Sequence, residues 1–92
     1  MALIYNHTDK EIRIKMGYDP DWIIIPPESE FVLQDSYANL FFGFGLETEA
    51  QLRECWNRLR VLGNDISWED FMKIYENLSA EKMVRTRKKG IA

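Results

Sequence analysis

The chain has 92 residues, of which 46% are hydrophobic, 13% aromatic and 29% charged, so it can form one small folded domain with a modest core. Its single cysteine and single histidine exclude a disulfide framework and a zinc-finger cluster. The net charge of −3 is divided unevenly: residues 1–49 hold three basic and nine acidic residues, whereas residues 50–92 hold nine basic and six acidic residues.

The first third of the chain favours β structure. Residues 11–16 alternate strictly between apolar and charged side chains, which is typical of a strand with one face in water. Residues 3–5 are the predicted partner strand. Because residues 6–10 are rich in turn formers, we expect a hairpin between these two strands.

Two more short strands are predicted before residue 35. Residues 22–25 are apolar and mostly β-branched, which indicates a strand buried on both faces. Residues 30–34 form the fourth predicted strand, after a break at Pro26 and Pro27. Four strands joined by short turns predict a small antiparallel sheet or a partial barrel.

The segment 37–45 is rich in aromatic residues and ends in a glycine loop. We expect one helical turn at its start. Its large side chains exceed what a single turn can bury, so they either pack between sheet and helices or form an interface anchor. The candidate interface residues are Tyr37, Phe41, Phe42 and Phe44.

The second half of the chain favours helices. Thr48 and Gln51 fit a capping box, and an apolar stripe follows to Leu62, before Gly63 stops the helix. This predicts a helix over residues 48–62. Ser67 opens a second helix, which either ends at residues 77–79 or continues to residue 84.

The predicted fold is therefore α+β, with a small antiparallel sheet packed by two or three C-terminal helices. A single domain spans residues 1–84, with a β part at 1–46 and a helical part at 47–84, and a basic tail follows at 85–92. The predicted core comprises Ile12, Ile14, Trp22, Ile24, Val32, Leu52, Trp56, Leu59, Phe71, Ile74 and Leu78.

No group of residues predicts catalysis. His7 lies in a predicted turn without a local partner, and Cys55 lies on the apolar face of a predicted helix, where a thiol behaves as a small hydrophobic group. The carboxylates are scattered over turns and strand edges rather than paired. We therefore expect a non-enzymatic protein with no catalytic, cofactor-binding or metal-binding residues, no cofactor and no small-molecule substrate.

Residues 63–71 resemble the second half of an EF-hand. Aligning Ile66 and Asp70 with that motif places the first three calcium-ligand positions on Leu59, Val61 and Gly63. None of these residues offers a side-chain oxygen, so the sequence excludes an EF-hand calcium site.

The C-terminal bases allow three interpretations. They are Lys82, Arg85, Arg87, Lys88 and Lys89. They form a solvated tail, contact nucleic acid without sequence specificity, or dock on an acidic protein surface. No apolar run approaches the ~20 residues that span a bilayer, and the first residues lack a secretory signal, so we expect an intracellular protein without membrane contact.

The first half of the chain also resembles a known class of proteins. Its relevant stretches are Asn6-His7-Thr8-Asp9-Lys10-Glu11-Ile12-Arg13-Ile14, the Gly17-Tyr18-Asp19-Pro20 turn, Ile25-Pro26-Pro27-Glu28-Ser29-Glu30-Phe31-Val32-Leu33, and the aromatic segment 37–45. This succession resembles the small accessory proteins of tailed bacteriophages. The resemblance implies a virion-associated structural protein that binds capsid, connector or tail subunits, and it assigns no functional residue.

The leading expectation is thus a phage structural protein, found in the virion and in the host cytoplasm during assembly, whose partners are virion proteins or further copies of itself. A first alternative is a small phage regulator that binds and inhibits a host enzyme. A second is a nucleic-acid-binding module that uses the basic tail, with nucleic acid otherwise a secondary partner.

Overall fold

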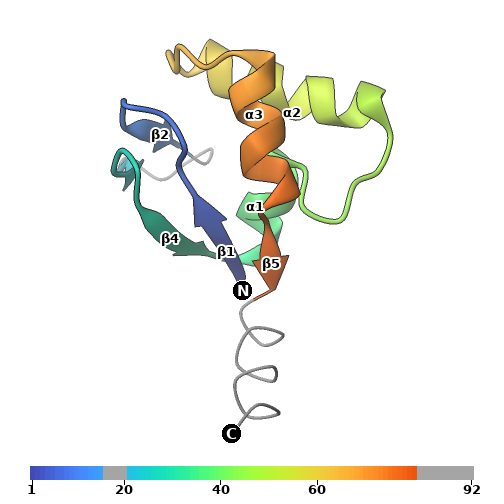
Figure 1. Cartoon of the computed structure of the whole chain (residues 1–92), viewed down its shortest axis with the longest axis horizontal. Coiled ribbons are helices and arrows are strands. Elements are labelled where there is room, and N and C mark those ends of the chain that lie inside the picture. The colour runs from blue at the N-terminus through green and yellow to red at the C-terminus, as the bar shows by residue number, and fades with distance from the viewer. Residues whose placement is uncertain (16–20, 81–92) are drawn as a thin grey trace, which may run out of the picture.

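The strands gather on one side of the molecule and the helices on the other, as Figure 1 shows. The computed structural model describes residues 1–15 and 21–80. In chain order the elements are β1 (Ala2–Tyr5), β2 (Ile12–Ile14), β3 (Ile23–Ile25), β4 (Glu30–Leu33), α1 (Asp35–Phe42), α2 (Glu49–Val61), α3 (Trp68–Glu76) and β5 (Ser79–Ala80). The predicted α+β fold is confirmed. Met16 and the predicted tail at 85–92 lie outside the described residues.

The strand pairing differs from the prediction. Strand β1 lies between β4 and β5 in one antiparallel sheet, and β2 pairs with β3 in another. The predicted hairpin between residues 3–5 and 11–16 is therefore wrong. Instead, the stretch from β1 to β2 runs antiparallel to the stretch from β3 to β4, so the two form a single long hairpin that is interrupted midway.

The interruption arises because the two arms of the hairpin have unequal lengths. Between the two paired regions, the arm that contains β1 and β2 runs from Tyr5 to Ile12. The arm that contains β3 and β4 runs only from Ile25 to Glu30. Extra residues in one strand bend an antiparallel pair, as in a β-bulge. The hairpin therefore bends between its β1–β4 part and its β2–β3 part.

The Asn6 side chain fills this bend. It is fully buried, and its Nδ2 donates to the carbonyl oxygens of Lys10 at 2.8 Å, Ile25 at 3.3 Å and Pro26 at 3.0 Å. Its Oδ1 accepts from the backbone N–H of Thr8 at 2.9 Å and from the Thr8 hydroxyl at 2.6 Å. One side chain thus replaces the missing ladder hydrogen bonds of both arms.

A second buried asparagine, Asn64, joins the hairpin to the helices. Its Oδ1 accepts from the Arg13 N–H at 2.9 Å, and its Nδ2 donates to the carbonyl oxygens of Arg13 and Leu59, each at 2.9 Å. Because Arg13 belongs to β2 and Leu59 to α2, this amide fixes the α2–α3 loop against the strand.

The core confirms part of the predicted set and corrects the rest. Ile12, Ile14, Leu52, Leu59, Phe71 and Ile74 are buried as predicted, and Trp56 and Leu78 are partly buried. Trp22, Ile24 and Val32 are instead 42%, 37% and 38% exposed, whereas Ile25 and Leu33 are buried. Residues 22–25 were expected to be buried on both faces, but β3 has one covered face, which carries Ile25. In β4 the covered face carries Leu33 rather than Val32.

The segment after β4 forms a longer helix than predicted. Helix α1 has 8 residues rather than one turn, and it ends at Gly43, which adopts φ +80°. A Cβ atom there would overlap the Leu52 side chain of α2, so this position needs glycine for both its conformation and its close approach.

The helical half follows the prediction closely. Thr48 caps α2 by accepting from the Gln51 N–H, and Ser67 caps α3 by accepting from the Asp70 N–H. Helix α3 ends at Glu76 and the chain enters β5 at Ser79, so the prediction that the second helix continues to residue 84 is wrong and its shorter alternative is correct. Within residues 1–15 and 21–80, no helix combines the length and the apolar character needed to cross a bilayer.

Replacing Asn6 is expected to weaken the whole fold. Asn6→Ala leaves buried backbone groups of both hairpin arms without partners, so we expect the free energy of unfolding to fall by about 3 kcal/mol in urea denaturation. Asn57→Ala, an exposed position on α2, is the control and should change it by less than about 0.5 kcal/mol. A loss below about 1 kcal/mol for Asn6→Ala would show that the bend does not depend on this amide.

Candidate interaction groove between helices α1 and α2

A surface groove lies where α1 meets α2. Its lining residues are Phe41, Glu54, Asn57, Arg58, Val61 and Leu62, and its volume is about 460 Å³. The lining combines an apolar floor with a charged rim. We call it the α1–α2 groove.

Helical spacing brings the groove residues of α2 together. Asn57 and Arg58 lie three and four residues after Glu54, and Val61 lies four and three residues after them, so the four share one face of α2. The residues that α2 buries, namely Leu52, Cys55 and Leu59, lie on another face. Val61 is consequently 86% exposed, a larger fraction than for any other large hydrophobic residue that the structure describes.

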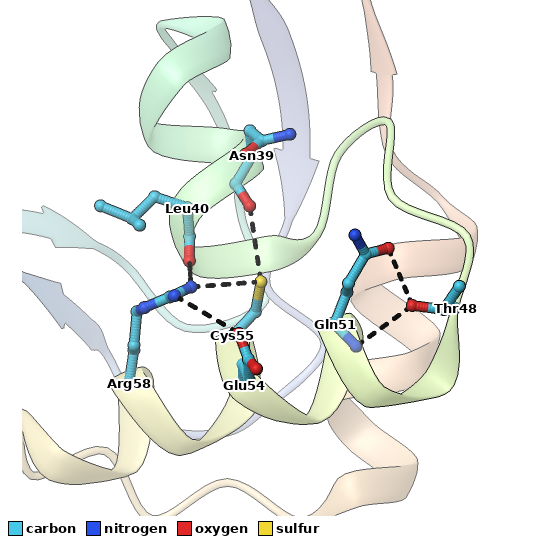
Figure 2. A network of polar contacts seen from close by, with 7 residues as sticks. All are labelled: Asn39, Leu40, Thr48, Gln51, Glu54, Cys55 and Arg58. Atoms are coloured by element: carbon cyan, nitrogen blue, oxygen red, sulfur yellow. Dashed lines mark hydrogen bonds and ion pairs between the residues drawn. The ribbon is translucent and has the colours of Figure 1, made fainter.

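Arg58 is held in place on this rim by three contacts, which Figure 2 shows together. Its Nη1 donates to the Leu40 carbonyl oxygen at 2.9 Å and lies 3.7 Å from the Cys55 Sγ, and its Nη2 lies 3.8 Å from the Glu54 carboxylate. Leu40 is in the last turn of α1, where carbonyl groups lack helical partners and favour a cation. Arg58 therefore joins the two helices and fixes the charge pattern of the groove.

Cys55 lies beneath this rim rather than in the groove. The thiol is fully buried and its Sγ donates to the Asn39 carbonyl oxygen at 3.4 Å. Burial raises the pKa of the Cys55 thiol, although the nearby Arg58 guanidinium acts in the opposite direction. The sulfur is thus a neutral thiol at physiological pH, which is not the form that acts as a nucleophile.

The predicted interface residues fall into two groups. Phe41 and Phe42 are core residues, and only Phe41 reaches the groove, whereas Tyr37 and Phe44 are partly buried against the core. The predicted charged contacts, namely Lys82, Arg85, Arg87, Lys88 and Lys89, lie outside the described residues.

His7 is exposed on the strand side, with its ring 4.5 Å from that of Tyr5. In the part of the chain that the structure describes, no three His, Cys, Asp or Glu side chains come together as a metal site. Among residues 1–15 and 21–80, the His7 side chain has this ring contact and neither a hydrogen bond nor an ion pair.

A cluster of arginine and tryptophan side chains was missed at the sequence level. Arg53 lies over the Trp68 ring at 4.3 Å and Arg60 over the Trp56 ring at 4.9 Å, and the two indole rings meet edge to face at 5.6 Å. In the sequence, the four-residue spacing of Trp56 and Arg60 indicates that these two side chains are neighbours on one helix face. Because the guanidinium groups cover the indoles, this cluster ties α3 to α2.

Comparison with known proteins identifies no relative. No family model, no curated protein and no solved structure matches this chain. What the chain does is therefore inferred from its own residues.

The buried state of Cys55 predicts slow thiol chemistry. We expect an aromatic disulfide reagent to label the native protein at least about 100-fold more slowly than the urea-unfolded protein, because labelling requires local opening and a deprotonated sulfur. Absorbance of the released aromatic thiol measures both rates. Native labelling within about tenfold of the unfolded rate would contradict the burial of Cys55.

Proposed function

We propose that this chain is a non-enzymatic interaction protein that binds neighbouring protein subunits through the α1–α2 groove. The observation that carries the proposal is the 86% exposure of Val61 beside Phe41 and Leu62. An apolar centre inside a polar rim is the arrangement of a protein interface, and aromatic and arginine residues contribute most of the energy at such sites.

The groove also indicates the chemistry of its partner. An apolar side chain would cover Val61, while a basic group would face Glu54 and a carboxylate would face Arg58. Because Arg58 is already fixed by Leu40 and Glu54, binding would order little of the rim. This pre-organisation favours a folded partner surface with a matching pair of charges.

The sequence resemblance to phage accessory proteins supports virion subunits as these neighbours, namely capsid, connector or tail proteins. On this proposal the protein is found in the virion, and in the host cytoplasm during assembly. A regulator that inhibits a host enzyme would use the same groove but would be absent from particles. Mass spectrometry of purified particles distinguishes the two, since a virion component is abundant there.

The groove can be tested by photo-crosslinking in the cells that make the protein. A photoreactive amino acid at position 61 should give a discrete adduct with one protein, whereas the same group at Glu69, an exposed position of α3, should not. Adding Arg58→Ala should lower the adduct yield at position 61 at least about fivefold, because it removes one charge of the rim.

Val61→Lys gives a second measurement of the same interaction. Lysine is favourable in the last turn of a helix, so we expect unchanged stability. The amount of the partner, identified by crosslinking, that Val61→Lys recovers in a pull-down should nevertheless fall at least about tenfold, because a charged side chain then replaces the apolar contact at position 61. Equal recovery of that protein by Val61→Lys and the unaltered chain would rule out the groove as the binding site.

A further inference from the structure

The long hairpin has one covered edge and one open edge. The outer edge of β1 pairs with β5, and the outer edge of β2 is covered by Asn64, whose amide bonds both the N–H and the C=O of Arg13. No strand of the described residues pairs with the outer edge of β3. An open strand edge is a template for pairing with another chain.

The pairing register shows which backbone groups β3 presents. Arg13 and Ile24 are opposite one another. Both backbone groups of Arg13 bond to Asn64, so Arg13 and Ile24 exchange no hydrogen bonds with each other. The N–H and C=O of Ile24 therefore point away from β2. Among the described residues, neither group of Ile24 has a hydrogen-bond partner outside the ladder.

The exposed side chains beside this edge are the apolar Trp22 and Ile24 and the basic Arg13 and Lys15, and the carboxylates of Glu11 and Asp21 lie just beyond them in sequence. Trp22 is 42% exposed and Ile24 is 37% exposed. The Lys15 ammonium lies 5.6 Å from the centre of the Trp22 ring, so it reaches from the C-terminal end of β2 to the start of β3. The exposed side chain of Arg13 lies across from Ile24 on the same face. Two cations therefore flank an apolar strand edge.

We propose that the outer edge of β3 binds an extended acidic peptide segment as an added strand. The segment accepts a hydrogen bond from the Ile24 N–H and donates one to the Ile24 carbonyl oxygen. Its carboxylates lie on the face that carries Arg13, Lys15, Trp22 and Ile24, and its alternate apolar side chains lie on the opposite face, beside Ile23 and Ile25. This surface is separate from the α1–α2 groove, so the inference stands independently of the proposed function.

The second arm of the hairpin limits the site to β3. Pro26 and Pro27 follow β3 directly, Pro lacks the N–H that an added strand needs, and Glu28 adopts φ 49°. Beyond that turn, β4 begins with the exposed carboxylate of Glu30, which repels an acidic segment. Strand β3 itself carries no carboxylate and lies beside Arg13 and Lys15, so charge favours the edge of β3 over that of β4 for an acidic segment.

The test uses synthetic peptides and the full chain in NMR titrations. The probe is a short blocked peptide of alternating glutamate and valine. We expect it to shift the amide resonances of Trp22 and Ile24 and to slow hydrogen exchange at Ile24, while Val61 is unaffected. A peptide with lysine in place of glutamate should bind at least about tenfold more weakly, because it meets two cations.

Two further controls separate charge from strand pairing. The double charge reversal Arg13→Glu with Lys15→Glu should weaken the acidic peptide at least about tenfold, whereas Lys73→Glu, an exposed position on α3, should change its affinity less than about twofold. A glutamate–valine peptide with alternate N-methylated amides should not bind, because it cannot donate to Ile24.

Several results would overturn the inference. The acidic peptide would leave the Ile24 resonance unshifted, or the lysine peptide or the N-methylated peptide would bind with the same affinity as the acidic peptide. Protection of Ile24 that rises with protein concentration in the absence of peptide would show that a second copy of this chain occupies the edge instead. If position 61 gives no crosslink but the acidic peptide still binds, the proposed function is contradicted and the site at β3 is not.

Discussion

The side-chain amide of Asn6 holds the two arms of the hairpin together at the point where their ladder is interrupted. It bonds backbone groups of its own arm at Lys10 and Thr8 and of the opposite arm at Ile25 and Pro26. Without it, buried carbonyl and amide groups would lack partners, which is costly in a core of this size. The hairpin can therefore bend only where this side chain is present.

The bend determines where the helices can pack. The β1–β4 part contacts α1, which follows β4 after a single residue, whereas β2 is fixed to the α2–α3 loop by Asn64. Gly43 then turns the chain so that α2 crosses α1 and Arg58 can reach the Leu40 carbonyl oxygen. The open edge of β3 follows from the same geometry, because β5 and Asn64 cover the outer edge of the arm that contains β1 and β2, whereas no described strand covers the outer edge of β3.

The parts that were predictable from sequence are those set by local signals. Thr48 and Ser67 cap helices within three residues of themselves, so the starts of α2 and α3 were correct. Strand pairing depends on contacts that are distant in sequence, and the turn formers at residues 6–10 form the bend rather than a hairpin turn. The exposure of Val61 and of Ile24 depends on which neighbours pack against α2 and β3, which no local pattern contains.

Amide hydrogen exchange at Thr8 and Glu28 tests the central claim most directly. The Thr8 N–H donates to the Asn6 side chain and the Glu28 N–H donates to the Thr8 carbonyl oxygen at 3.2 Å, so both report on the bend. We predict that both exchange as slowly as Ile4 in the middle of β1, because they open only with the fold. Exchange of both at the rate of an unprotected loop, with Ile4 still protected, would contradict a bend held by Asn6.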